Sequence, residues 1–486
     1  MTLRQSAFSA GRWTAASLLT RALLQIAQTV VLARLLAPAD FGLMAIVGAV
    51  YAIVWLFIDF GLSNALIHFP QPSPAVLSTL YWLNMGAAVL MMLLFVGLAW
   101  PFALLYHQPS LTPAMLMMSL VMPLAALGQQ FRVMAEKELR FATLAVIEVV
   151  AAVCGFLAAL LVGFLGGGVY SLIAAILVTA GTSSALAWLF LSKGLRPTFQ
   201  FTLREVVPFL RYGSYRLGDT LFNSIQMQMD VLIGGAVVGA TAMGVYTLPR
   251  EQALRIATTV VNPIVTRVGL PVMAIVQADK AALKSLYLRT LRMTSSVNFP
   301  VYAALALWAD EVVAILLGEQ WRNAGHFMRL FAVWGLIRST GNPVGSLLYA
   351  TGQVRRAFWW NLGQLAVVPA LLWPAAALYG TEGLALTMLL VQVLIFYPFF
   401  RVLVRPVCGA RFQEYIGQML PALATTAVAV GCGLLVTSIL PPEPLTVLVV
   451  GGFALGVTYV GVSCIFNKPW IDAAMELIWP LFRRSA

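Results

Sequence analysis

The amino-acid sequence predicts an all-α polytopic membrane protein with about 14 transmembrane helices. Two observations carry this prediction. Of the 486 residues, 61% are hydrophobic and only 10% are charged, which is too little polar surface for a soluble protein of this length. The apolar residues also form runs of about 20, the length that an α-helix needs to cross the hydrocarbon core of a bilayer. These runs follow one another along the whole chain.

The apolar runs define fourteen expected spans. They cover residues 13–35, 42–67, 79–106, 111–133, 142–165, 169–191, 212–238, 243–275, 286–317, 324–350, 357–378, 383–402, 415–439 and 445–466. The connections are short, and proline or glycine marks several of them, as in 70–74 and 166–168. Pro123, Pro300 and Pro343 fall inside spans, so we expect kinked or broken helices there.

Lysine and arginine are distributed unequally between the two sides that these spans define. The basic loops on one side, which is also the side of both termini, contain Arg140, Arg204, Lys284, Arg355 and Arg405. The other side receives only Arg322. Cytoplasmic loops of membrane proteins carry the excess of basic residues. We therefore expect an even number of spans, with both termini in the cytoplasm.

An internal repeat is visible in the sequence. Val31–Gly42 aligns with Ile233–Gly244. The same offset superimposes polar positions of the first span on those of the seventh, namely Thr14, Ser17, Arg21 and Gln28 on Arg216, Asp219, Asn223 and Asp230. We therefore expect two six-helix lobes, 1–200 and 201–405, related by a pseudo-two-fold axis along the membrane normal. Residues 406–486 would add two C-terminal helices and a cytoplasmic tail.

A polar stripe runs along the seventh span. Its residues recur at alternating steps of three and four, as Arg216, Asp219, Asn223, Gln226 and Asp230. This spacing places them on one face of an α-helix. A charge near the bilayer centre costs several kcal/mol, so the stripe must face protein or a water-filled cavity. We interpret it as one wall of a transport pathway.

The eighth span continues the polar pattern. Glu251, Arg255 and Asn262 share a face, and the first two are spaced for an ion pair. Two interpretations stay open for such residues, because polar side chains can line a pathway or can simply hold helices together. For Gln226 and Asn262 the two are evenly balanced, whereas the charges favour the pathway.

Polar residues in the first lobe allow the same two interpretations. Arg21, Gln25 and Gln28 in the first span favour the pathway. Asp59, late in the second span, belongs either to the pathway or to the cytoplasmic rim. Glu148 lies early in its span, so we interpret it as a rim or packing residue.

Eight short stretches, spread over both lobes, carry a family resemblance. They are Asp59–Ile67, Thr79–Asn84, Gly128–Arg132, Lys137–Leu139, Asn262–Arg267, Asn298–Pro300, Gly335–Arg338 and Gly341–Leu347. They resemble the polysaccharide transporter family, the Wzx-type flippases of lipid-linked oligosaccharides, and within it the colanic acid exporter branch. This family belongs to the MOP superfamily, together with the MATE exporters and the lipid II flippase.

The resemblance implies the MATE-like fold and a function. Such proteins move undecaprenyl-diphosphate-linked oligosaccharides across the bacterial inner membrane, for exopolysaccharide or lipopolysaccharide synthesis, by alternating access. The expected partners are this substrate, membrane lipids and other polysaccharide-assembly proteins. We expect the chain to act as a monomer. The net charge of +12 reflects membrane topology, so no nucleic-acid partner is expected.

The resemblance also gives the polar residues roles. Arginine pairs with phosphate or uronate through two parallel hydrogen bonds, which suits an anionic substrate. The expected substrate-binding residues are Arg21, Gln25, Gln28, Arg216, Asn223, Arg255, Asn262, Arg267, Arg292 and Arg338. The carboxylates expected to couple transport to an Na⁺ or H⁺ gradient are Asp59, Asp219, Asp230 and Glu251. We expect no cofactor and no metal site.

Two other function classes remain as alternatives. A MATE-like exporter of soluble compounds would share the fold, although a basic pathway is unsuited to cationic drugs. A membrane-embedded polysaccharide polymerase or ligase is less favoured, because no loop is long enough to form a catalytic domain. A P-loop is also absent from the sequence, so ATP hydrolysis by this chain is not expected. We therefore predict a transporter and not an enzyme.

Overall fold

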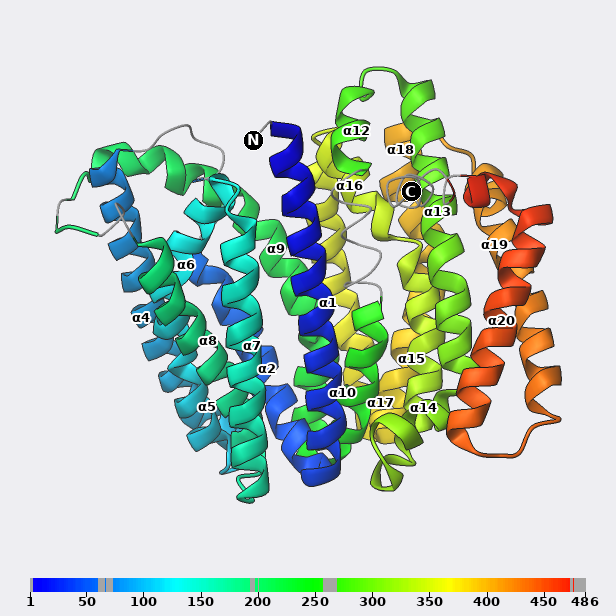
Figure 1. Ribbon diagram of the computed structural model, residues 1–486, viewed down its shortest axis with the longest axis horizontal. Helices are drawn as coiled ribbons and strands as arrows, with labels where there is room; N and C mark the ends of the chain where they lie inside the picture. The colour runs from blue at the N-terminus through cyan, green and yellow to red at the C-terminus, as the bar shows by residue number, and fades with distance from the viewer. Residues whose placement is uncertain are drawn as a thin grey trace. The chain divides into compact units, whose positions relative to one another are not determined.

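A computed structural model describes residues 3–59, 66, 73–192, 197–199, 201–256, 269–472 and 475. Within the helices, the description omits the side chains of residues 3–12, 15, 59, 203–204, 208–219, 256 and 271. Over these described ranges the chain is helical and forms no strand (Figure 1). The chain divides into two compact units, 1–244 and 245–486.

Within its described residues, the first unit contains eight helices and the first turn of a ninth. They are α1 (Leu3–Leu35), α2 (Pro38–Asp59), α4 (Pro74–Leu105), α5 (Leu111–Ser119), α6 (Val121–Lys137), α7 (Phe141–Phe164), α8 (Val169–Leu191) and α9 (Leu203–Val237), followed by the start of α10 (Ala240–Ile256). The α9 helix packs against α2 and α4, and the hydroxyl of Tyr106 donates a hydrogen bond to the carbonyl of Leu232 at 2.8 Å.

The second unit continues from α10. Its helices are α12 (Leu270–Ile275), α13 (Lys280–Leu307), α14 (Ala309–Leu316), α15 (Ala324–Ser339), α16 (Asn342–Ala350), α17 (Val354–Phe399), α18 (Arg405–Cys408), α19 (Phe412–Thr437) and α20 (Pro444–Phe466). A 3₁₀ turn at Glu319–Trp321 and a π-helical turn at Phe400–Val404 complete it.

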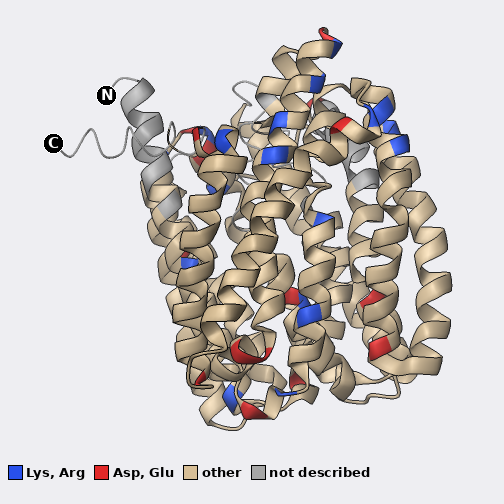
Figure 2. Ribbon diagram, turned by 90° about the vertical axis from the view of Figure 1, so that its right-hand side faces the viewer, with Lys and Arg blue, Asp and Glu red and all other residues tan. Residues whose placement is uncertain are grey.

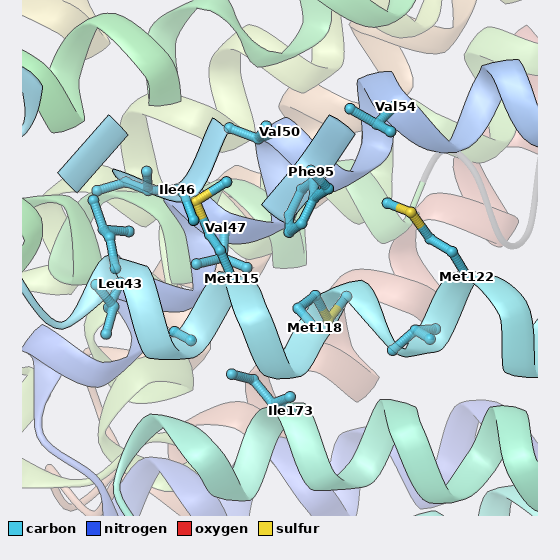
Figure 3. Close-up of a cluster of buried hydrophobic side chains, with 14 of the residues drawn as sticks. Leu43, Ile46, Val47, Val50, Val54, Phe95, Met115, Met118, Met122 and Ile173 are labelled. Atoms are coloured by element: carbon cyan, nitrogen blue, oxygen red, sulfur yellow. The ribbon is translucent and has the colours of Figure 1, made fainter. Parts of the chain in front are cut away.

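Each unit has its own apolar core. In the first unit, Val47, Phe95, Met115 and Ile173 bring α2, α4, α5 and α8 together (Figure 3). In the second unit, a cluster of Leu291, Phe299, Leu347, Phe400 and Tyr415 joins α13, α16, α19 and the π-helical turn. In a bilayer the lipid is as apolar as these side chains, so close packing stabilises the cores more than removal from water does.

The predicted spans agree with the helices where both are described. Nine helices of the described chain are long and apolar enough to cross a membrane, and Lys280–Leu307 with Ala309–Leu316 form a tenth candidate bent by 77°. The count of fourteen remains a prediction. The lobe boundary at residue 200 remains one as well, because the division at residue 244 separates packing units and not repeats.

The longest helix consists of two helical arms. At about 1.5 Å per residue, the 46 residues of α17 would extend about 69 Å, more than twice the hydrocarbon thickness of about 30 Å. Gly380 has φ 60° and ψ −143°, a conformation outside the helical region. An ideal Cβ at Gly383 would lie 2.2 Å from the carbonyl oxygen of Ala375, so the two arms approach closely. The break coincides with the loop expected between 378 and 383.

Proline predicts the breaks only in part. The break between α15 and α16 directly precedes Pro343, as expected, and α6 begins two residues before Pro123. Helix α13 continues through Pro300, and the sharp bend comes at Trp308, between α13 and α14. Helix α13 is therefore not broken at Pro300, and a kink there remains a prediction.

The aligned glycines of the internal repeat contact each other. An ideal Cβ at Gly42 would lie 1.7 Å from the carbonyl oxygen of Ala240, and one at Gly244 would lie 1.8 Å from that of Pro38. In the sequence alignment, Gly42 corresponds to Gly244 and Pro38 to Ala240. Gly42 thus approaches Ala240, and its equivalent Gly244 approaches Pro38, the equivalent of Ala240. A two-fold relation between the repeats requires such a reciprocal contact. This backbone contact supports the repeat.

Candidate functional site

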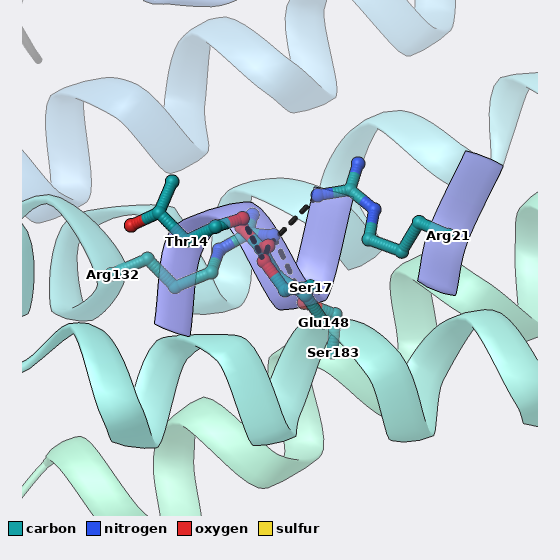
Figure 4. A network of polar contacts seen from close by, with 6 residues as sticks. All are labelled: Thr14, Ser17, Arg21, Arg132, Glu148 and Ser183. Carbon is teal, nitrogen blue, oxygen red and sulfur yellow. Dashed lines mark hydrogen bonds and ion pairs between the residues drawn. The ribbon is translucent and has the colours of Figure 1, made fainter. Parts of the chain in front are cut away.

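A polar network joins α1 to α7 in the first unit (Figure 4). Arg21 Nη1 donates a hydrogen bond to Glu148 Oε2 at 2.8 Å, which makes a close ion pair. The hydroxyl of Ser17, one turn earlier in α1, lies 3.4 Å from the same oxygen and 3.1 Å from the carbonyl of Thr14. The Arg21 and Glu148 side chains are 44% and 36% exposed, so the ion pair is only half covered by protein.

A second arginine extends this network. Arg132 of α6 donates from Nη1 to Ser183 Oγ of α8 at 2.9 Å, and it interacts electrostatically with both Glu148 and Arg21 (Figure 4). Glu136 of α6 also interacts electrostatically with Arg132. Four helices therefore contribute to one cluster of two guanidinium groups and two carboxylates, whose formal charge is zero.

A different arginine contact ties the end of α20 to α13. Arg292 Nε donates to Asn467 Oδ1 at 2.8 Å, and Asn467 Nδ2 donates to Ser296 Oγ at 2.8 Å. Asn467 is fully buried, and Tyr459 donates to the carbonyl of Ser296 at 2.7 Å. This arrangement fits an anchor for α20, and substrate binding by Arg292 remains a prediction.

The polar stripe of the seventh span lies on α9. Asp230 is fully buried, Gln226 is half-buried and Asn223 is exposed, so the stripe runs from the surface into the first unit. The side chains of Arg216 and Asp219 lie outside the described residues. The decrease in exposure along the described half of the stripe fits both a pathway wall and a contact between helices.

The expected charge pair on α10 is present as an electrostatic interaction. Glu251 interacts with Arg255, as the spacing of four residues predicts, and also with Arg250. The Glu251 side chain is exposed and Arg255 is half-buried, whereas Arg250 is only 4% exposed. Sequence analysis singled out the pair but not the buried Arg250.

The remaining predicted residues are dispersed. The Arg338 guanidinium lies 5.1 Å from the ring centroid of Trp334 on α15, a cation–π contact. Gln25 is exposed and Gln28 half-buried on α1. Asn262, Arg267 and the Asp59 side chain lie outside the described residues.

Figure 2 shows that charged residues are sparse along the helices, with Lys and Arg in blue and Asp and Glu in red.

Three contact partners are not predicted by the sequence. Glu148 was interpreted as a rim or packing residue, although it pairs with Arg21, and neither Arg132 nor Asn467 was assigned to a contact inside the membrane. Glu148 lies 127 positions from Arg21, Asn467 lies 175 from Arg292 and Arg132 lies 51 from Ser183, so no helical spacing reveals the pairs. The available signal for Glu148 was its position in an apolar span, where a carboxylate needs a cation.

Comparison with known proteins agrees with this geometry. Residues 31–325 match the family described as "Polysaccharide biosynthesis protein". The chain is 30% identical to the "Lipopolysaccharide biosynthesis protein WzxC" of Escherichia coli, over 86% of this chain and 84% of that protein. It is 25% identical to the "Succinoglycan biosynthesis transport protein ExoT" of Rhizobium meliloti, over 72% of this chain and 69% of that protein.

Solved structures show the fold. The "Lipid II flippase MurJ" in an inward closed conformation matches with a TM-score of 0.71 at 13% identity, covering 94% of this chain and 99% of that one. An inward-facing MATE transporter of the MOP superfamily matches with a TM-score of 0.58 at 12% identity, covering 84% and 95%. The chain therefore has the MOP fold of a multi-pass membrane protein, and it belongs to the polysaccharide biosynthesis protein family.

Proposed function

We propose that the protein translocates undecaprenyl-diphosphate-linked oligosaccharide repeat units across the bacterial inner membrane, for exopolysaccharide or lipopolysaccharide synthesis. The observation that carries this proposal is the combination of membership in a polysaccharide biosynthesis family with the MOP fold over almost the whole chain. The relatives' names speak of the biosynthesis of lipopolysaccharide and the transport of succinoglycan. A chain with this ancestry and this fold is suited to moving the glycan and not to making it, so we propose no catalytic activity.

The proposed mechanism is alternating access. Three described arginines on the helices, Arg21, Arg255 and Arg338, offer forked donors that fit phosphate or uronate oxygens. The lipid tail would stay in the bilayer while the head group passes through protein. We propose coupling to an Na⁺ or H⁺ gradient through Asp59, Asp219, Asp230 or Glu251. Both termini would be cytoplasmic, and one chain would suffice.

The MATE-like exporter of soluble compounds is the alternative. Its supporting observation is the match to MATE transporters, which has a lower TM-score than the match to the lipid II flippase. An efflux assay with fluorescent cationic dyes separates the two classes, because only the exporter would lower dye accumulation in cells.

Depletion in cells tests the proposal. In a strain that depends on this protein, its depletion should trap lipid-linked repeat units in the cytoplasmic leaflet while their synthesis continues. Surface polysaccharide should be lost, and the trapped intermediate should appear in extracted lipids. If depletion leaves surface polysaccharide intact with no accumulated intermediate, the proposed function is wrong.

A further inference from the structure

The two arms of α17 meet at one end of the second unit. The first arm begins at Val354, and the second arm continues into the π-helical turn at Phe400–Val404. Trp360 of the first arm packs edge-on against Phe399 of the second, with ring centroids 5.7 Å apart. The beginning of one arm and the end of the other therefore lie side by side.

Arg356 bridges the two arms. Its Nε donates to Gln353 Oε1 at 2.9 Å, and its Nη1 donates to the carbonyl of Val402, in the π-helical turn, at 3.4 Å. In an α-helix that carbonyl would accept from the N–H four residues later, but Pro406 has no N–H. Arg356 thus supplies a donor that the helix lacks. Two contacts hold the guanidinium in place, and three of its five N–H groups make no contact with the described residues.

Three further arginines surround this bridge. Arg355 precedes it in the chain, Arg401 lies next to the bridged carbonyl, and Arg405 follows one turn later; all of these side chains are exposed. None of the three makes an ion pair or a side-chain hydrogen bond with the described residues. Glu414, in the first turn of α19, is already paired with Lys284 Nζ at 2.7 Å. The end of α17 thus carries four guanidinium groups, and no described carboxylate is paired with them.

The exposed face of the first arm changes from charged to aromatic to apolar. Trp359 lies one helical turn from Arg355 and Arg356, so the three share a face. Gly363 and Val367 continue this face over the next two turns. Trp359 is 57% and Val367 is 58% exposed, so the described protein leaves this face largely open.

The second arm repeats this order. Tyr397 lies one turn before Arg401, and the face behind it continues through Leu394 and Leu390. These three residues are 52%, 70% and 58% exposed. Tryptophan and tyrosine concentrate at the level where lipid head groups meet the hydrocarbon. On both arms, arginine therefore lies at the level of phosphate, and the aliphatic face lies at the level of acyl chains.

We propose that this end of α17 binds an anionic phospholipid, with its phosphate on Arg356 and the neighbouring arginines and its acyl chains along the exposed faces of both arms. A guanidinium donates two parallel hydrogen bonds to a phosphate, and the bridge positions Arg356 before the lipid arrives. A soluble phosphate would use the arginines but not the apolar faces.

The charge of the membrane favours this occupant. The loops of Arg355 and Arg405 are predicted to be cytoplasmic, and the cytoplasmic leaflet contains anionic lipids that attract clustered basic residues. The bound lipid is a constituent of the membrane and not the transported glycan carrier. The proposal therefore goes beyond the proposed function and does not depend on it.

The test is native mass spectrometry of the full-length protein released from detergent micelles. Phosphatidylglycerol and phosphatidylcholine with identical acyl chains are added in equal amounts, and the first lipid retained by the protein gives the ratio of the two Kd values. We expect the wild type to prefer phosphatidylglycerol at least about tenfold. Glycerol 1-phosphate, which has the phosphate without acyl chains, should not displace the bound lipid.

Two variants and a matched control locate the site. Arg401→Gln combined with Arg405→Gln removes two charges and no described contact, so the protein should fold and the preference should fall at least about fivefold. Arg356→Lys keeps the charge but loses the fork, so the preference should fall about threefold. The control combines Lys280→Gln with Arg289→Gln, which removes two exposed charges from the first half of α13, and it should keep the wild-type ratio.

Each outcome decides the proposal. Equal retention of the two lipids by the wild type overturns it, and so does an unchanged ratio in the folded Arg401→Gln/Arg405→Gln protein. An equal loss of preference in the α13 control would show a general attraction to basic helix ends and would also overturn the site. Displacement by glycerol 1-phosphate would reassign the arginines to a soluble phosphate.

If the Arg401→Gln/Arg405→Gln protein does not fold, Arg356→Lys decides in its place, and an unchanged ratio there overturns the site. Binding is measured without transport. A failed translocation assay with the expected lipid preference would reject the proposed function and keep the site, and the reverse result would do the opposite.

Discussion

Arg292 and Asn467 show how a charge inside the membrane can be anchored by a neutral partner. Asn467 is fully buried, and both ends of its amide are used, by Arg292 Nε and Ser296 Oγ. A buried amide oxygen that loses its donor costs about 1–3 kcal/mol. The contact therefore holds the end of α20 against α13.

We predict that Arg292→Ala lowers the thermal stability of the purified protein, because it leaves Asn467 Oδ1 buried without its donor. The loss should be about 1–3 kcal/mol. Unfolding in detergent, followed by fluorescence size-exclusion, measures it, with the exposed Arg322→Ala as control. Undiminished stability together with lost export would instead make Arg292 a substrate-binding residue.

Arg255 should behave in the opposite way. Its side chain is half-buried and interacts with the exposed Glu251, so water can replace its contacts when it is removed. We predict that Arg255→Ala folds but loses export, and that Arg255→Lys recovers only part of it, because lysine lacks the fork. Complementation of a flippase-deletion strain measures export, and the exposed Arg322→Ala is the control. Aggregation of both Arg255 variants would make the residue structural.

Helices in this protein depend on glycine where two backbones meet or the chain reverses. Gly380 breaks α17 with φ 60° and ψ −143°, a conformation that residues with a Cβ avoid. We predict that Gly380→Ala destabilises the protein by about 1–3 kcal/mol. Gly363→Ala in the same helix is the control, since nothing lies within 4 Å of its Cβ and alanine favours a helix. Equal melting temperatures for the two variants would contradict this explanation of the break.

The contact between α2 and α10 makes a second prediction. A methyl group at Gly42 would lie 1.7 Å from the Ala240 carbonyl oxygen, so Gly42→Ala must push the two backbones apart. We expect loss of folded protein or of export, whereas Gly48→Ala on the same helix, with no atom within 4 Å, should retain both. Expression, size-exclusion and complementation measure the result. Wild-type folding and export of Gly42→Ala would show that the protein does not depend on this close contact.

Spacing along the chain predicts elements better than it predicts their partners. The apolar runs locate the helices and the turn near Gly380, and the Glu251–Arg255 interaction follows from helical geometry. The 77° bend at Trp308 is not readable, because no proline marks it. The Arg21–Glu148 pair joins positions that only the packing of α1 on α7 brings together, so the sequence shows two costly charges but not their pairing.

At the scale of the molecule, charge and membrane orientation are linked. With the four native cysteines, Cys154, Cys408, Cys432 and Cys464, replaced, single cysteines can report the side of each loop. We predict that a cysteine at position 140 or 405 reacts only from the cytoplasm and one at position 322 only from outside. Labelling with a membrane-impermeant maleimide, before and after cell lysis, measures this. External labelling at 140 or 405 would be incompatible with the fourteen-span topology.

The central claim is that this chain alone moves a lipid-linked oligosaccharide between leaflets. The direct measurement uses purified protein in liposomes that contain a polyprenyl-diphosphate-linked oligosaccharide with a fluorescent label on the sugar. A membrane-impermeant quencher added outside removes the signal of the outer leaflet. With the wild type, quenching should exceed the outer-leaflet fraction, whereas with Arg255→Ala or empty liposomes it should stay at that fraction. Quenching that stops at the outer-leaflet fraction with folded wild-type protein, with and without an Na⁺ or H⁺ gradient, would contradict it.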